Sequence, residues 1–294
     1  MDSRNRKRKK EAEALDREVK LALERVKYKV LVLSGKGGVG KSTVATNLAL
    51  TLAEAGRRVG LLDVDLHGPS IPTLLGLTGK RARFVDDRIM PIQHAENLKV
   101  ISMGNLLRGR DDAVIWRGPL KMKAITQLIG GVEWGDLDYL VVDSPPGTGD
   151  EPLSIAQLIP GAHAVVVTTP QEISLSDVRK SVGFCNEVGL KLIGLIENMS
   201  GYVCPNCGHR DDIFGTGGGE RTASQLSLRL LGKIPIDSGV VRAGDSGLPR
   251  LSKTEESPAA EAFRRVVDAI RSVLENDASA PDRALVEADR AKNE

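Results

Sequence analysis

A glycine-rich segment that follows an apolar run constrains the fold of this chain more than any other feature. The run Lys29–Ser34 predicts a buried strand, and it leads directly into Gly35-Lys36-Gly37-Gly38-Val39-Gly40-Lys41-Ser42-Thr43. This segment fits the P-loop pattern of glycine, four residues and Gly-Lys-Ser, in the strand-to-helix context that the pattern requires. Glycines let backbone amides approach phosphate oxygens, and the following helix adds its positive N-terminal end. The segment therefore predicts a nucleotide-phosphate site in an α/β fold.

Strand and helix signals alternate along the rest of the chain. Short apolar runs predict strands at Lys29–Ser34, Val59–Asp63, Leu98–Ser102, Tyr139–Asp143, Ala164–Thr168 and Leu192–Glu197. Helical spacing of apolar residues predicts helices at Ser42–Ala55, Leu120–Leu128, Ser174–Val188, Arg221–Leu230 and Ala259–Leu274. Several strand runs are apolar throughout, so we expect a mostly parallel central sheet flanked by helices on both faces.

The composition predicts one large domain between two polar ends. Residues 1–27 combine a basic tail with a leading helix, residues 28–275 form a single P-loop domain with a Cys-x-x-Cys insertion near 201–219, and residues 276–294 predict a loosely ordered polar tail. A basic tail can be a solvated terminus or can contact nucleic acid or an acidic partner, but the net charge of +2 does not favour nucleic acid. No apolar run is long enough to span a bilayer, and no secretion signal is evident. We expect a cytoplasmic protein without a membrane partner.

The phosphate site needs a lysine, a hydroxyl and a carboxylate. Lys41 is expected to neutralise charge on the β- and γ-phosphates, and the Ser42 hydroxyl is expected to bind Mg²⁺. The apolar strand Tyr139–Asp143 ends in an aspartate, a pattern that places the carboxylate of Asp143 beside the magnesium ion. The loop Ser144–Asp150 that follows suits the sensing of a γ-phosphate.

A second acidic strand end lies at Asp63-Val64-Asp65. Side chains alternate along a strand, so the two aspartates point to opposite faces and cannot do the same work. We expect Asp65 to orient or deprotonate the attacking water, and Asp63 to support the magnesium site or the strand end. His67 is expected to be a hydrogen-bonding loop residue.

Two of the three cysteines form a Cys-Pro-x-Cys-Gly turn at Cys204 and Cys207. Tetrahedral zinc or a cubane cluster needs four protein ligands, so one chain cannot complete a four-cysteine site. A symmetric dimer can, with two thiolates from each copy. A bridging zinc, His209 as a further ligand and a redox pair remain open alternatives. Cys185 lies among apolar residues of a predicted helix and is expected to be a core residue.

Lys36, five residues before Lys41, makes this the deviant form of the P-loop. Together with the two aspartate segments it resembles the family that includes MinD, ParA and the nitrogenase iron protein. Three further segments resemble the Mrp/ApbC subgroup of iron–sulfur cluster carrier ATPases: Asp65-Leu66-His67-Gly68-Pro69-Ser70-Ile71-Pro72, Glu197-Asn198-Met199-Ser200 and Cys204-Pro205-Asn206-Cys207. The resemblance runs from about Tyr28 to about Ile270.

The resemblance implies a homodimer that sandwiches ATP and Mg²⁺, with Lys36 reaching the partner's phosphate. It also implies that Asn198 contacts the adenine base, with Pro235 nearby. The implied catalytic residues are Lys36, Lys41 and Asp65. A dimer that sandwiches nucleotides would bring together two chains, each with two of the four cysteine ligands. Both arguments therefore favour a [4Fe-4S] cluster that bridges two copies and passes to apo iron–sulfur proteins. The alternative is a positioning or partition ATPase with a structural zinc.

Overall fold

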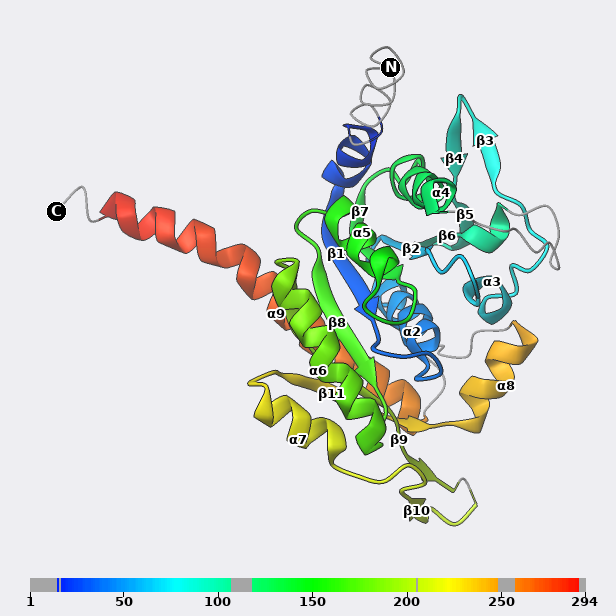
Figure 1. Cartoon of the computed structure of the whole chain (residues 1–294), viewed down its shortest axis with the longest axis vertical. Helices are drawn as coiled ribbons and strands as arrows, with labels where there is room; N and C mark the ends of the chain where they lie inside the picture. Colours follow the sequence, from blue (N-terminus) through cyan, green and yellow to red (C-terminus); the bar gives the residue numbers. More distant parts are fainter. Residues whose placement is uncertain (1–14, 16, 107–117, 205, 248–256, 291–294) are drawn as a thin grey trace.

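One twisted sheet forms the centre of the molecule (Figure 1). The computed structural model describes residues 15, 17–106, 118–204, 206–247 and 257–290. Within them the strands of the sheet are β1 (Val26–Leu33), β2 (Val59–Asp63), β5 (Ile92–Ala95), β6 (Leu98–Ser102), β7 (Leu137–Asp143), β8 (His163–Thr168), β9 (Lys191–Val203), β10 (Arg210–Asp211) and β11 (Leu230–Ile236). They pair in the order β10-β9-β8-β1-β7-β2-β6-β5, and β11 also pairs with β9. Only the β5–β6 and β9–β10 pairs among these described strands are antiparallel, which confirms a mostly parallel sheet.

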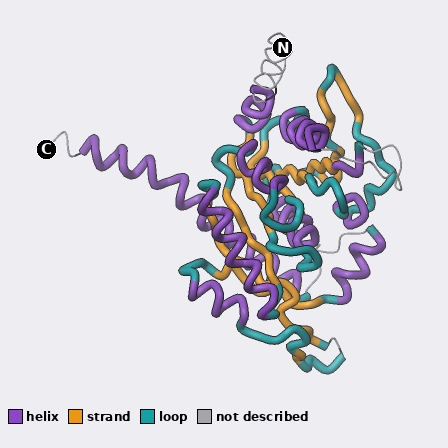
Figure 2. The backbone as a smooth tube through the Cα atoms, viewed as in Figure 1, coloured by secondary structure: helices purple, strands orange, loops and turns teal. Residues whose placement is uncertain are grey.

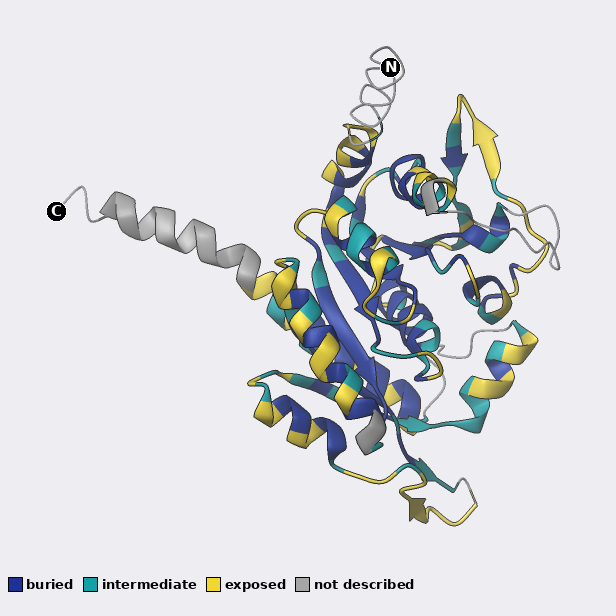
Figure 3. Cartoon of the chain, in the orientation of Figure 1, coloured by how far each residue is buried: buried dark blue, intermediate teal, exposed yellow. Residues whose placement is uncertain are grey.

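Helices cover both faces of the sheet, as Figure 2 shows. They are α2 (Lys41–Glu54), α3 (Ile71–Leu74), α4 (Gly118–Gly130), α5 (Asp150–Leu158), α6 (Glu172–Glu187), α7 (Gly218–Gln225), α8 (Ser238–Ser246) and α9 (Pro258–Arg290). Apolar side chains of α2 and α9 form one core cluster with the sheet, and those of α4, α5 and α6 form another on the opposite face. Figure 3 shows the resulting pattern, with buried strands between helices whose outer sides are exposed.

Strand β1 is buried on both faces, which explains why polar and apolar residues do not alternate along it. Val30 and Val32 belong to the cluster with α2 and α9, whereas Leu31 and Leu33 belong to the cluster on the other face. All four side chains are buried. A strand with apolar neighbours on both sides gains from an apolar residue at every position.

The leading helix packs onto this domain. Residues 17–24 are helical, and the buried side chains of Val19 and Leu23 join the core cluster of α4. A Cβ atom on Gly130 would lie 2.7 Å from the side chain of Val19, so the two helices approach closely at that glycine. The basic tail before the helix lies outside the described residues.

Several predicted boundaries were wrong. The helix predicted at Arg221–Leu230 ends at Gln225, and Leu230 begins β11 instead. Gly232 and Pro235 interrupt the apolar run of β11 and hid this strand from the sequence pattern. A Cβ atom on Gly232 would lie 2.6 Å from the side chain of Val266 in α9, so the glycine permits close packing of helix on strand.

Other elements were absent from the prediction. They are the short helices α3, α5 and α8, the strands β5 and β10, and a separate antiparallel pair formed by β3 (Arg83–Val85) and β4 (Arg88–Met90). The tail from residue 276 onward was predicted to be loosely ordered, but α9 continues through Pro281 to Arg290. Alanine, leucine, glutamate and arginine in that segment are strong helix formers, which favours this continuation. Among the described residues, we find no helix with both the length and the apolar character to cross a bilayer.

Candidate nucleotide site and cysteine pair

The P-loop connects the end of β1 to the start of α2, as the sequence predicted. Gly38 and Gly40 adopt positive φ angles of 82° and 79°, a left-handed conformation that favours glycine. A Cβ atom on Gly35 would lie 2.5 Å from the backbone oxygen of Asp177 in α6. Glycine is therefore required at these positions by backbone conformation or by packing, before any ligand is considered.

The loop forms a pocket of about 230 Å³ at the carboxyl end of the sheet. Its lining combines P-loop residues with residues from two other loops: Ser34, Lys36, Gly37, Gly38, Gly40, Lys41, Ser42, Thr43, Asp65, Ser70 and Pro146. Ligands of open parallel sheets bind at this edge, outside the carboxyl ends of the strands. The fold thus brings most of the predicted phosphate-binding residues and Asp65 into one pocket.

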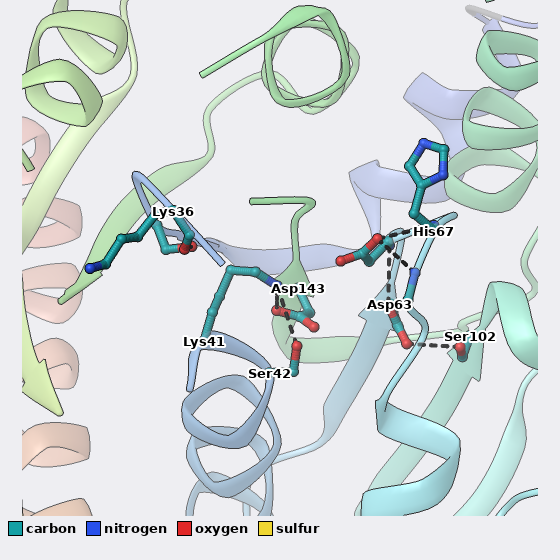
Figure 4. A network of polar contacts seen from close by, with 10 residues as sticks. Lys36, Lys41, Ser42, Asp63, His67, Ser102 and Asp143 are labelled. Carbon is teal, nitrogen blue, oxygen red and sulfur yellow. Dashed lines mark hydrogen bonds and ion pairs between the residues drawn. The ribbon is translucent and has the colours of Figure 1, made fainter. Parts of the chain in front are cut away.

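A buried ion pair lies at the base of the P-loop, where Lys41 Nζ contacts Asp143 Oδ1 (Figure 4). The Asp143 side chain has no exposed surface, and burial raises its pKa even though the ammonium group of Lys41 opposes this effect. Lys41 Nζ also lies 3.4 Å from the Ser42 hydroxyl oxygen. Among the described residues Asp143 Oδ2 is buried without a hydrogen-bond partner. A hydroxyl oxygen beside an unpartnered carboxylate oxygen fits the oxygen ligands that Mg²⁺ prefers.

Asp63 lies directly beside Asp143 in the register of β2 on β7. Its carboxylate is buried and accepts hydrogen bonds from the Ser102 hydroxyl at 2.8 Å and from the Asp65 backbone N–H at 3.1 Å. Burial, with a further contribution from the charge of Asp143, raises the pKa of Asp63 to about 8. Of the two roles predicted for Asp63, these contacts favour support of the strand end. Ser102 was not identified from the sequence.

Asp65 lines the phosphate pocket and also an adjoining pocket of about 510 Å³. Its Oδ1 accepts hydrogen bonds from the backbone N–H groups of His67 and Gly68, which fixes the turn after β2. Nε2 of His67 lies 2.7 Å from Nζ of Lys121, which forms an ion pair with Glu151. His67 is thus a hydrogen-bonding loop residue, as predicted, whereas Lys121 and Glu151 were not identified from the sequence.

The Lys36 side chain extends away from the pair of Lys41 and Asp143 (Figure 4). The Ser34 hydroxyl donates a hydrogen bond of 2.9 Å to the Lys36 carbonyl and holds the backbone at this point. Lys36 therefore does not join the charged contacts at the base of its own P-loop. Its expected action on a partner's phosphate remains a prediction.

Asn198 contacts the P-loop from β9. Its Nδ2 donates a hydrogen bond of 2.9 Å to the Val39 carbonyl, and the side chain is buried. A Cβ atom on Gly40 would lie 2.3 Å from this same Nδ2. Ile234 of β11 lies opposite Asn198 in the sheet, which brings Pro235 close to it. The two residues assigned to the adenine base by resemblance are thus neighbours, and the adenine contact itself remains a prediction.

The cysteine pair lies in the turn between β9 and β10, where residues 203 and 210 pair. The Cys204 N–H donates to the His209 carbonyl and the Gly208 N–H donates to the Cys204 carbonyl, both at 2.9 Å. Cys204 is half-buried and Cys207 is exposed. Hydrogen bonds from the backbone of Asn206 and then of Cys207 lower the pKa of Cys204, which favours the thiolate form that binds metals.

The other cysteine belongs to the core, as predicted. Cys185 is fully buried in the cluster of α6, and burial raises its pKa to about 11. Within the described part of the chain, no group of three or more His, Cys, Asp or Glu side chains is placed to hold a metal ion. Cys204 and Cys207 of one copy therefore cannot by themselves supply the four protein ligands of a tetrahedral metal site, and their role as metal ligands remains a prediction.

Comparison with known proteins identifies the family. Residues 25–271 match the ParA family, described as NUBPL iron-transfer P-loop NTPases. The chain belongs to this family. It is 44% identical over 273 residues to an iron-sulfur cluster carrier protein of Saccharolobus solfataricus, and the match covers 92% of each chain. It is 47% identical over 251 residues to a cytosolic Fe-S cluster assembly factor NUBP2 homolog of Trichoplax adhaerens, covering 84% of this chain and 95% of that one.

A solved structure agrees with the fold. The nucleotide-binding protein of Archaeoglobus fulgidus in complex with ADP has a TM-score of 0.73 and 37% identity, and the match covers 83% of this chain and 95% of that chain. Membership of a P-loop NTPase family confirms the fold class and the resemblance inferred from Lys36 and the aspartate segments.

Proposed function

We propose that this chain is an ATP-hydrolysing carrier of iron–sulfur clusters. Two copies hold a [4Fe-4S] cluster between them through Cys204 and Cys207 of each, and they pass it to apo iron–sulfur proteins. The observation that carries the proposal is the pair of half-buried Cys204 and exposed Cys207 on a chain whose P-loop lines a pocket. The Saccharolobus relative, which is named as a cluster carrier, supports it. A reducing compartment such as the cytosol would keep both thiols available.

The nucleotide site acts through positioned charges. The backbone N–H groups of the P-loop bind the phosphates, and Lys41 neutralises their charge. Lys41 then exchanges part of its contact with Asp143 for contact with phosphate oxygens. Mg²⁺ at Ser42 and Asp143 would neutralise charge that develops on the leaving phosphate. Asp65, held by the turn that follows β2, orients the attacking water or accepts its proton.

The cluster is the cargo of this protein. Half of its four thiolates come from each copy, so any change in the packing of the two copies alters both the exposure of the cluster and its ligand geometry. Nucleotide at the P-loop favours one arrangement of the copies over another, which is a population shift. Lys36 contributes to this arrangement by reaching the partner's nucleotide.

Anaerobic reconstitution tests the proposal. The wild-type protein is expected to hold one [4Fe-4S] cluster per dimer, measured as iron and acid-labile sulfide and by absorption spectroscopy. Cys207→Ala is expected to lose the cluster and to keep ATP hydrolysis, and Cys185→Ala serves as the control that keeps both. Equal iron and sulfide in wild type and Cys207→Ala would refute the proposal, and zinc without sulfide in protein purified without oxygen would favour the structural-zinc alternative.

A further inference from the structure

Both ends of the loop that carries the cysteines meet at one buried carboxylate. Glu197 of β9 has no exposed surface. Its Oε1 accepts a hydrogen bond of 2.6 Å from the Ser200 hydroxyl, and its Oε2 accepts one of 2.6 Å from the Gly219 backbone N–H. The cysteine loop, defined here as residues 201–218, follows Ser200 within β9 and ends just before Gly219 in α7. One side chain therefore closes the base of this loop.

The glycines at the end of the loop fit this contact. A Cβ atom on Gly219 would lie 2.5 Å from Glu197 Oε2, and one on Gly218 would lie 2.3 Å from the Pro170 carbonyl oxygen. Residues with side chains cannot begin α7 this close to β8 and β9 without displacing their neighbours. Gly218 and Gly219 are thus more than a flexible connection, because they let the N-terminus of α7 approach the carboxylate of Glu197.

The same stretch of β9 contacts the nucleotide pocket. Asn198, the next residue, donates its hydrogen bond to the Val39 carbonyl of the P-loop. Met199 follows with a positive φ of 56°, which is rare for a residue other than glycine and holds the chain in a strained path. The Asn198 side chain therefore links the P-loop backbone at Val39 to the residue that directly follows Glu197 in β9.

We propose that Glu197 is a positioning residue that couples nucleotide occupancy of the P-loop to the placement of Cys204 and Cys207. Binding at the P-loop shifts Asn198, Glu197 follows, and its two hydrogen bonds move both ends of the cysteine loop together. The proposal rests on the proposed function only in taking these cysteines as the cluster site. The coupling itself is a property of the metal-free protein and can be measured there.

The test follows the two thiols in the reduced, metal-free, full-length protein. The rate of iodoacetamide labelling at Cys204 and Cys207 is measured by mass spectrometry with and without a non-hydrolysable ATP analogue and Mg²⁺. In wild type, the labelling rates with and without the nucleotide analogue are expected to differ by a ratio of about five or more, which is the range of ordinary coupling between two sites. Gly219→Ala, whose methyl group displaces the carboxylate of Glu197, is expected to bring the ratio close to one while the protein still binds the analogue. Gly183→Ala adds the same methyl group to α6 at a point where no described residue beyond its own helix backbone and chain neighbours lies within 4 Å, and it should behave as wild type.

Two variants of Glu197 sharpen the result. Glu197→Gln keeps one acceptor for Gly219 and offers a donor to Ser200, so it should retain the ratio, whereas Glu197→Ala should lose it. If Glu197→Ala does not fold, Gly219→Ala decides. A wild-type ratio of one, or a full ratio in Gly219→Ala, would overturn the coupling. Failure of the cluster proposal appears elsewhere, as missing iron and sulfide in a wild-type protein whose labelling ratio is intact.

Discussion

Replacing Lys41 by methionine should destabilise the protein that holds no nucleotide. The side chain of Lys41 is 6% exposed and that of Asp143 is 0% exposed, so the ion pair is buried. Methionine has a similar length but no charge, and it leaves Asp143 buried beside Asp63 without the ammonium group that contacts it. Removing one partner of a buried ion pair costs about 3–5 kcal/mol. That is a large part of the roughly 5–15 kcal/mol by which domains are stable.

Urea unfolding without nucleotide or metal measures this loss. With a slope of about 3 kcal/mol per molar urea, the midpoint for Lys41→Met should fall by about 1–2 M at pH 8. The loss should be smaller at pH 5. A carboxyl group whose folded pKa is raised contributes stability below its unfolded pKa, and this contribution is lost as pH rises to the folded value, about 8 for Asp63. Burial raises the pKa of Asp143 as well, and Lys41 opposes this rise, so in Lys41→Met the carboxyl group of Asp143 can take up a proton at pH 5 and relieve its unpaired charge.

Two controls separate this explanation from a general effect of the substitution. Lys180→Met breaks an ion pair with Asp177 in which the lysine is 68% exposed, and it should cost less than about 1 kcal/mol. Lys41→Met combined with Asp143→Leu removes both charges and should recover most of the lost stability. Lys41→Met with an unchanged midpoint, or a double variant as unstable as the single one, would refute the reasoning.

Three further predictions follow from the same structure. Gly40→Ala should weaken nucleotide binding about tenfold or more in a fluorescent-nucleotide titration. The reason is that the left-handed backbone at this position costs alanine about 1–2 kcal/mol and the new Cβ meets Asn198. Unchanged affinity would contradict this. Asp63→Asn should gain stability over wild type by about 1.4 kcal/mol per pH unit as pH rises from about 4 to about 8, and a gain independent of pH would show that Asp63 is not protonated when folded. Native alkylation followed by mass spectrometry should modify Cys204 well before Cys185, and equal rates would contradict the burial of the latter.

The sequence predicted those parts of the fold whose signals are local. Strands β2 and β6 were predicted with the bounds that the structure shows, because each is a short and mostly apolar run. The P-loop was found for the same reason, since its backbone geometry depends on glycines within nine consecutive residues. β11 was missed because its glycine and proline interrupt the strand pattern, and only the packing of α9 explains them.

The contacts that the sequence did not predict join distant residues with no characteristic spacing. Lys121 and Glu151 are 30 positions apart, and Glu197 and Gly219 are 22 positions apart. Neither pair can be recognised in a single sequence, because neither follows a periodic spacing or belongs to a motif. Glu197 lies within a segment that carries the family resemblance, but its hydrogen bonds depend on where α7 begins. That position could not be predicted once the helix was expected to start at Arg221.

The charges at the base of the P-loop are arranged for a ligand rather than for the stability of the empty protein. Asp63 and Asp143 are buried side by side, Lys41 contacts Asp143, and the hydrogen bonds of Asp63 are directed within the protein. A magnesium nucleotide would add a cation beside Asp143 and phosphate oxygens beside Lys41, so each charge would gain a partner. Ligand at about 100 times its Kd adds about 2.7 kcal/mol to the free energy of unfolding. Wild type should therefore gain that amount from Mg²⁺ and ADP, whereas Lys41→Met, which has lost the phosphate contact, should gain little.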